Sequence, residues 1–301
     1  MSSMEQDKAR RAVKPYRTQE RPRSGPFYQQ PGRGLSWGGL AGRVLVAGAG
    51  GLCLAFISLP LLALLGRVPF DTVWATLGTP LVLDALRLSA LSSLVSLGLI
   101  ILFGTPVAYG LGRGQFPGKR VIETVLELPL VLPPAVAGVA LLFAFGRRTP
   151  LGEVLHDLGL DVAFTLAAVV LAQTFVAAPF YIKAARVAFQ GIPRELLEAA
   201  AVQGAGAGAI FRHIIGPLAL PGIVGGAIMG WARAVGEFGA TILFAGNFPG
   251  RTQTMPLAIY LALESNVNAA IVLAAILVVS SFSVLLIFKL VSGRSLDVTP
   301  D

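Results

Sequence analysis

The chain has 301 residues, of which 54% are hydrophobic and only 13% are charged, and its mean hydropathy is +0.73. Ordinary soluble domains carry about 25% charged residues, so this composition excludes a large soluble domain and predicts an all-α, polytopic membrane protein. The net charge of +8 does not indicate a nucleic-acid partner, because the basic residues gather in an N-terminal segment without the pattern of a folded basic face.

The N-terminal segment, residues 1–42, is basic and rich in Pro, Gly, Gln and Ser. This composition predicts a disordered tail that contacts anionic membrane lipid. A membrane domain over residues 43–291 and a short tail over residues 292–301 follow it. With the N-terminal segment inside, eighteen Lys or Arg lie in the inner segments 1–43, 113–120, 183–216 and 289–301, and five lie in the outer segments 67–87, 147–161 and 244–266. The positive-inside rule therefore predicts that both termini are cytoplasmic.

A transmembrane helix needs about 20 mostly apolar residues, and six segments of the membrane domain meet this need. The predicted spans are 43–66, 86–112, 124–146, 163–185, 217–243 and 268–291. The outer loop before the second span contains Pro69, Gly78 and Pro80, and we expect it to lie along the membrane surface.

Three prolines, Pro129, Pro133 and Pro134, interrupt the third span. Proline removes a backbone donor and bends a helix, which in lipid requires neighbours or water to satisfy the freed carbonyls. We therefore predict a bent helix. Either it borders an internal pathway or the bend is purely structural.

Charged residues lie near the cytoplasmic start of the third span. Glu123 and Glu127 are one helical turn apart, and Lys119 precedes Glu123 by four residues. This spacing predicts an interfacial ion-pair face.

A polar loop over about residues 190–217 separates the fourth and fifth spans. Pro193 suits the first turn of a short helix, the segment 194–203 continues it, and Gly204 is placed to end it. A second short helix, about residues 207–215, is expected to end at Gly216-Pro217, where the chain re-enters the membrane. Because the rest of the chain is mostly apolar, this polar loop indicates that a soluble partner binds it.

The fifth span combines small residues with a pair of charges. Gly222, Gly226 and Gly230 recur every fourth residue and predict close packing of another helix. Arg233 and Glu237 follow, one turn apart and deep in the predicted span. Intramembrane charges face a partner or a wet cavity, so the pair either braces the bundle or lines an ion path.

The polar loop resembles the EAA loop of ABC-importer permeases, with Gly216 where that family often has Leu. The residues that carry the resemblance are Glu198, Ala199, Ala200, Gly204, Ile214 and Pro217. The downstream segments 236–241, 245–247, 249–254 and 256–260 resemble the molybdate permease branch, whose near relatives are the sulfate and tungstate permeases. The similarity extends over about residues 86–291.

The resemblance implies a type I ABC-importer permease fold and transport of molybdate, or alternatively of sulfate or tungstate, by alternating access. It implies a homodimer in the cell membrane, two cytoplasmic ATPase subunits and an extracytoplasmic oxyanion-binding protein. The six loop residues named above would couple the permease to the ATPase. The chain itself would have no catalytic residue, metal or cofactor, because ATP and Mg²⁺ are used by the ATPase.

The candidate residues of the anion pathway are Arg233, Glu237, Thr241 and Asn247. A dianion in transit needs compensation without tight capture. Helix N-termini, hydroxyls and amides could supply this compensation more gently than many fixed cations. Two other classes of protein are disfavoured. An intramembrane enzyme would need a catalytic constellation at membrane depth, whereas both His residues lie outside the spans, and a carrier that does not use ATP would not need the polar loop.

Overall fold

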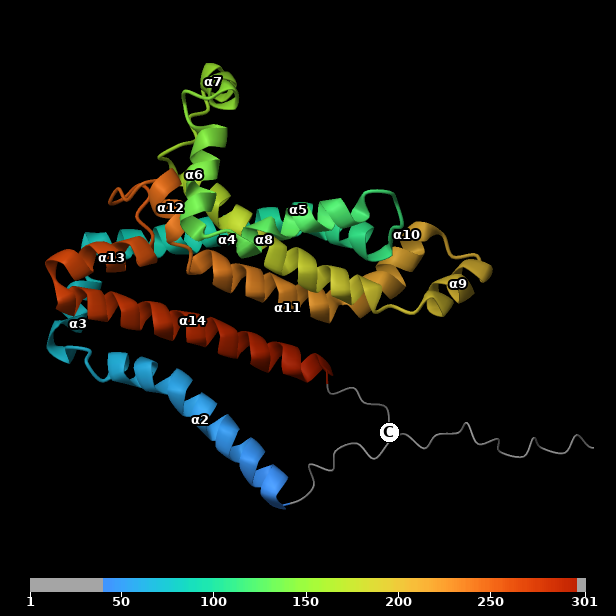
Figure 1. The fold of residues 1–301 in the computed structure, drawn as a ribbon, viewed down its shortest axis with the longest axis horizontal. Coiled ribbons are helices and arrows are strands. Elements are labelled where there is room, and N and C mark those ends of the chain that lie inside the picture. The colour runs from blue at the N-terminus through green and yellow to red at the C-terminus, as the bar shows by residue number, and fades with distance from the viewer. Residues whose placement is uncertain (1–39, 297–301) are drawn as a thin grey trace, which may run out of the picture. The chain divides into compact units, whose positions relative to one another are not determined.

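The computed structural model describes residues 40–296, and within this range the chain forms helices, turns and loops without a strand. Most of the two predicted tails lies outside the described residues. The helices, labelled as in Figure 1, are α2 (Leu40–Leu65), α3 (Phe70–Leu77), α4 (Pro80–Arg113), α5 (Lys119–Val131), α6 (Pro134–Phe145), α7 (Pro150–Asp157), α8 (Leu166–Gln190), α9 (Arg194–Val202), α10 (Ala207–Ile210), the π-helical turn η1 (Phe211–Ile215), α11 (Gly216–Val235), α12 (Gly239–Phe244), α13 (Met255–Ser265) and α14 (Val267–Leu296).

The chain divides between Leu59 and Pro60 into two compact units. The first unit contributes the part of α2 up to Leu59, an uninterrupted apolar helix. The second unit contains the end of α2 and all the later helices, and the features below belong to it.

Within the described range, five helices are long and apolar enough to cross a membrane, and the bent pair α5–α6 makes six if it counts as one span. The predicted all-α architecture with about six spans is therefore confirmed. The second span begins at Pro80, earlier than the predicted residue 86, because Pro at the first helical position fits a helix start.

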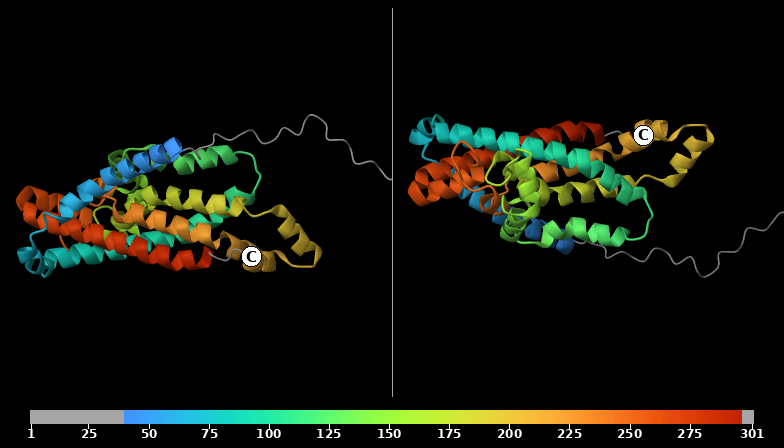
Figure 2. Two further views of the ribbon diagram at one scale, coloured as in Figure 1. Left: turned by 90° about the horizontal axis from the view of Figure 1, so that it is seen from below. Right: turned by 90° about the horizontal axis from the view of Figure 1, so that it is seen from above.

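Three helices, α4, α8 and α11, form the centre of the second unit. Figures 1 and 2 show α8 lying alongside both α4 and α11. Their shared core contains Tyr181 and Phe189 of α8, which are completely buried, and Ile100 of α4. Burial of such large side chains fixes these helices against one another.

The predicted glycine ribbon of the fifth span is confirmed as a packing surface. A Cβ atom added at Gly222 would lie 2.4 Å from the Cβ atom of Ala188, and one added at Gly226 would lie 2.9 Å from that of Ala184. Real Cβ atoms do not approach so closely, so α11 can pack on α8 at this distance only with glycine at these positions.

The predicted bend of the third span is confirmed and is sharp. The axes of α5 and α6 differ by 116° at the break between them, where Pro133 and Pro134 prevent the helix from continuing. Beyond the break, α6 packs on α12 (Figure 1), and a Cβ atom added at Gly138 would lie 2.8 Å from the carbonyl oxygen of Ala240.

The acidic residues of α5 form their ion pairs with a different helix from the one expected. Glu123 lies 3.2 Å from the Arg186 guanidinium, and Glu127 lies 4.0 Å from Nζ of Lys183, so both pairs join α5 to α8. Lys119, the expected partner, donates a hydrogen bond to the carbonyl of Gly114 instead. Helical spacing correctly indicates the shared face of the two Glu residues, but it does not reveal a neighbouring helix.

The fifth predicted span is wrong in extent, because the helix ends at Val235 and a separate short helix, α12, begins at Gly239. The apolar composition continues across this break, and hydropathy alone therefore does not show it. The turn between the two helices carries Glu237.

Candidate functional site

The polar loop presents α9 as a short helix with a free surface. Glu198 and Ala199 are exposed, Ala200 is half-buried, and Val202 is 89% exposed. On the opposite face, Leu197 packs against the α4–α8–α11 core. One face thus fixes α9 to the bundle, while the other is available to a partner.

Gly204 ends α9 as predicted. Its φ angle is +86°, in the left-handed region, and it stands two residues beyond the last residue of the helix. The N–H groups of Gly204 and Ala205 donate hydrogen bonds to the carbonyls of Ala201 and Ala200. This is the arrangement with which glycine closes a helix C-terminus, and it directs the chain into α10.

The second helix of the loop does not end at Gly216-Pro217, contrary to the prediction. Residues 207–235 form one helical run, with a π-helical turn at residues 211–215. Pro217 has no N–H to donate to the carbonyl four residues before it, and Gly216 donates to Phe211, five residues before it. The proline thus shifts the hydrogen-bond register without stopping the helix. Within this run, Ile214 is half-buried and Pro217 is exposed.

The base of the loop is held by Arg113, which the sequence did not identify. The Arg113 guanidinium donates a 2.8 Å hydrogen bond to the carbonyl of Ile192, just before α9. Next to it, a Cβ atom added at Gly112 would lie 3.1 Å from the Arg186 carbonyl. The end of α4 therefore holds the α8–α9 turn in place. A basic residue in the last turn of a span, opposite a polar loop, is the signal that could have revealed this contact.

Arg233 and Glu237 form an ion pair at the far end of α11. The Arg233 guanidinium lies 2.7 Å from one carboxylate oxygen of Glu237, whose side chain is 1% exposed. The other oxygen accepts a 2.7 Å hydrogen bond from the N–H of Ala240 in the first turn of α12. A single carboxylate thus joins α11 to α12, and its charge is compensated.

The remaining pathway candidates are not part of this ion pair. Thr241 is fully buried in α12. Asn247 accepts a 2.9 Å hydrogen bond from the Gln253 amide and donates a weaker one to the carbonyl of Leu257. These bonds occupy the Asn247 amide in holding the loop between α12 and α13.

Serines line one buried face of α4, a feature that sequence reasoning missed. The Ser96 hydroxyl lies 3.0 Å from the carbonyl oxygen of Val170 and 3.1 Å from the amide oxygen of Gln173, and it can donate its one proton to either. Ser93 accepts a hydrogen bond from the indole of Trp231. Serine spacing of three and four residues in an apolar span could have revealed this polar face.

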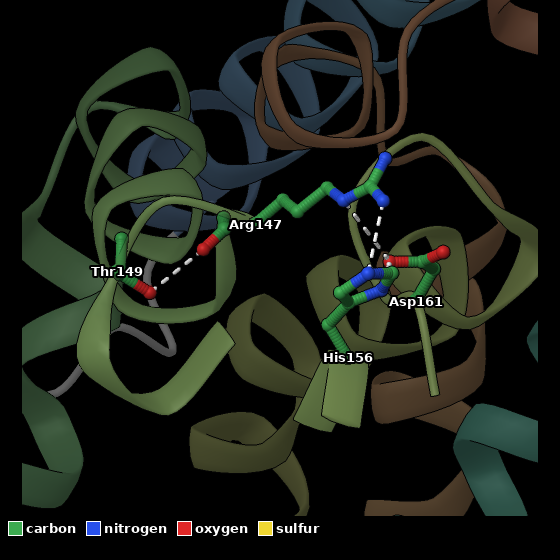
Figure 3. A network of polar contacts seen from close by, with 5 residues as sticks. Arg147, Thr149, His156 and Asp161 are labelled. Atoms are coloured by element: carbon green, nitrogen blue, oxygen red, sulfur yellow. Dashed lines mark hydrogen bonds and ion pairs between the residues drawn. The ribbon is translucent and has the colours of Figure 1, made fainter. Parts of the chain in front are cut away.

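A separate polar network occupies the segment around α7 (Figure 3). The guanidinium of Arg147 lies 2.9 Å from Nε2 of His156, and Nδ1 of the same ring lies 3.0 Å from Asp161. Nearby, the Thr149 hydroxyl accepts from the N–H of Gly152 and starts α7. His156 thus joins Arg147 and Asp161 through its two ring nitrogens.

Comparison with known proteins gives consistent matches. The family described as binding-protein-dependent transport system inner membrane component matches residues 100–295. The molybdenum transport system permease protein ModB of Mycobacterium tuberculosis is 41% identical over 233 residues, which is 77% of this chain and 88% of the relative. The ModB protein of Escherichia coli K12 is 44% identical over 61% of this chain and 79% of its own length.

Solved structures share the fold at low sequence identity. A bacterial alginate ABC transporter in complex with an alginate pentasaccharide-bound periplasmic protein matches with a TM-score of 0.64 and 18% identity, covering 87% of this chain and 98% of that one. The MetNI methionine ABC transporter, in an inward-facing form, matches with a TM-score of 0.54 and 20% identity over 71% and 93% of the two chains.

Proposed function

Because the chain belongs to the family of binding-protein-dependent transport system inner membrane components, we propose that it forms the membrane path of an ATP-driven molybdate importer. It is a multi-pass permease subunit of the inner membrane, and a separate subunit hydrolyses ATP. An ATPase and an extracytoplasmic binding protein are the partners that this family implies.

The names of the relatives support molybdate as the cargo, since identities above 40% extend over most of the chain. The proposal further includes two copies of the chain per importer. It also places both termini in the cytoplasm, which the excess of Lys and Arg in the inner segments supports. ATP and Mg²⁺ would bind to the ATPase subunits.

The cargo is tested by reconstituting the chain with its ATPase and binding protein in proteoliposomes. ATP-dependent uptake of labelled molybdate is measured with unlabelled tungstate or sulfate as competitors. Uptake that sulfate does not reduce supports the molybdate assignment. Preferential uptake of sulfate or of tungstate would assign the importer to that anion instead.

The coupling role of α9 is proposed from its exposed face. Glu198, Ala199 and Ala200 would dock on the ATPase, and Gly204 would let the chain turn so that the helix is presented. Ile214 and Pro217 would carry the movement onward, because residues 207–235 are one continuous helical run. A rigid helix transmits displacement along its axis, which a flexible loop cannot do.

The same run ends at Arg233, next to the carboxylate that joins α11 to α12. Closure of the ATPase would thus shift α11, then α12 and the bent segment α6 packed on it. Alternating access would result from this movement. Arg233 is neutralised by Glu237 but partly exposed, so it could attract an oxyanion without trapping it. Thr241 and Asn247 would support this region from α12 and the following loop.

Docking is tested by disulfide or bifunctional crosslinking from a cysteine placed at Val202, in a chain whose native cysteine is replaced by Cys53→Ser. We expect crosslinks to the ATPase from position 202 and none from a cysteine at Val154 in α7, which is also exposed. Crosslinking from position 154 alone would overturn the assignment of α9.

A further inference from the structure

An apolar groove of about 430 Å³ lies between the segment after α2 and the C-terminal helix. Leu65, Val68, Phe70 and Val73 line one side, and α14 from Val272 to Ser280 lines the other. Sites for small molecules commonly measure about 300–1,000 Å³, so the groove is large enough to hold part of an organic molecule.

The groove lies on a membrane-spanning helix. The segment Val267–Ile287 of α14 has a mean hydropathy of 2.8 and satisfies the length of a span. The groove follows this helix over nine residues, from Val272 to Ser280, or about 12 Å at 1.5 Å per residue. It begins near the first turns of α14 and continues toward the middle of the span.

The short helix α3 carries two exposed aromatic side chains beside the groove. Phe70 and Trp74, one turn apart, are 77% and 82% exposed. Tryptophan is enriched at the boundary between lipid tails and headgroups, so Trp74 favours a position of α3 at that boundary. The depth of the groove therefore corresponds to the acyl region beneath that boundary.

Two opposite charges accompany the aromatic residues. Arg67 directly precedes Val68 of the groove wall, and Asp71 lies in the first turn of α3. Both are exposed, and neither has an ion-pair partner among the side chains that the structure describes. A guanidinium binds phosphate through charge-assisted hydrogen bonds, and a carboxylate offers the same to an ammonium group.

We propose that this groove binds one acyl chain of an aminophospholipid of the phosphatidylethanolamine class. The acyl chain lies along α14 between Val272 and Ser280. Arg67 binds the phosphate and Asp71 binds the ammonium group. The observation that selects a lipid is charge complementarity, because the phosphate and the ammonium group of one headgroup would compensate Arg67 and Asp71, which adjoin groove-lining residues in the chain. The proposal requires a membrane position for the chain and is independent of the cargo.

The test uses the purified importer complex, delipidated in mild detergent and titrated with phosphatidylethanolamine or phosphatidylglycerol. Native mass spectrometry counts the lipids retained on each chain. We expect phosphatidylethanolamine to bind about tenfold more tightly to the wild type than to Val279→Phe, in which the added ring occupies the groove. Val284→Phe is the matched control, since Val279 and Val284 are both partly exposed residues of α14 and only Val279 lines the groove.

The headgroup contacts are tested with neutral variants. Arg67→Gln should weaken both lipids, whereas Asp71→Asn should weaken only phosphatidylethanolamine, and Arg148→Gln, at another exposed arginine, should weaken neither. Equal retention by Val279→Phe and Val284→Phe would overturn the proposal. So would binding that ignores both charge changes, or a loss of association between protein copies in Val279→Phe with no change in bound lipid.

Discussion

At the scale of single residues, Gly204 is constrained by its backbone conformation and Glu237 by its buried charge. Gly204 holds a backbone conformation that side chains disfavour. Glu237 is a buried carboxylate whose two oxygens have different partners, Arg233 and the N–H of Ala240. One governs how α9 is presented, and the other governs how α11 meets α12.

Gly204→Ala should reduce anion uptake per ATP hydrolysed. A Cβ atom in the left-handed region costs about 1–2 kcal/mol, and α9 can relieve this strain by reorienting. Gly206→Ala is the control, since Gly206 is equally exposed, has a negative φ angle and has room for a Cβ atom. The measurement is the ratio of uptake to hydrolysis in proteoliposomes, and equal ratios for the two variants would remove the special role of Gly204.

Arg233→Met should destabilise the chain more than Arg233→Met combined with Glu237→Gln. The single change leaves a buried carboxylate without its counter-ion, at a cost of about 3–5 kcal/mol. The double change leaves a neutral amide whose oxygen can still accept from Ala240. Thermal unfolding in detergent measures the difference, and a double variant no more stable than the single one would show that the ion pair does not neutralise a buried charge.

At the scale of elements, α11 packs closely on α8 through Gly222 and Gly226. At its N-terminus it continues into the polar loop. Its glycine face fits against α8, and its N-terminal extension through η1 and α10 leads to the turn that follows α9. The contact between Arg113 and Ile192 fixes the start of α9 to α4. The loop is thus held by two helices of the bundle rather than being a free connection.

Gly226→Leu should disrupt the α8–α11 interface, whereas Gly225→Leu should be tolerated. An added Cβ atom meets Ala184 at 2.9 Å at the first position and nothing within 4 Å at the second. Overpacking of this kind costs about 1–3 kcal/mol. Expression level and unfolding temperature of the two neighbouring variants measure it, and equal loss in both would contradict the packing account.

Arg113→Gln should lower uptake per ATP while leaving assembly with the ATPase intact, because it frees the α8–α9 turn without altering the exposed face of α9. A buried carbonyl that loses its donor costs about 1–3 kcal/mol. Arg120→Gln serves as the control, since Arg120 is exposed and makes no ion pair among the residues described. Failure of the ATPase to co-purify with Arg113→Gln would indicate a role in docking instead.

The sequence predicted those elements whose cause is local. The apolar spans, the glycine ribbon, the proline bend and the stop at Gly204 each follow from residues within one helical turn or one span. The break after Val235 was missed because apolar residues continue through it. The partners of Glu123 and Glu127 were missed because they lie on α8, about sixty residues away in the chain. Contacts between helices that are far apart in the sequence depend on the tertiary fold, which the spacing of residues within one helix does not reveal.

At the scale of the whole molecule, the second unit combines the exposed surface of α9, for which we propose the coupling role, with a continuous helix and a neutralised charge pair next to α12. No chemical step is required of this chain, since its proposed task is to change which side of the membrane its path faces. The energy for that change would come from ATP bound elsewhere, and α9 would be the point of entry.

The most direct test of this account is the accumulation of labelled molybdate in proteoliposomes that contain the chain, its ATPase and its binding protein. We predict accumulation against a gradient that requires hydrolysable ATP and is lost when the exposed face of α9 is changed by Glu198→Arg together with Val202→Glu. Molybdate accumulation that continues undiminished in that variant, or that proceeds without ATP, would contradict the account.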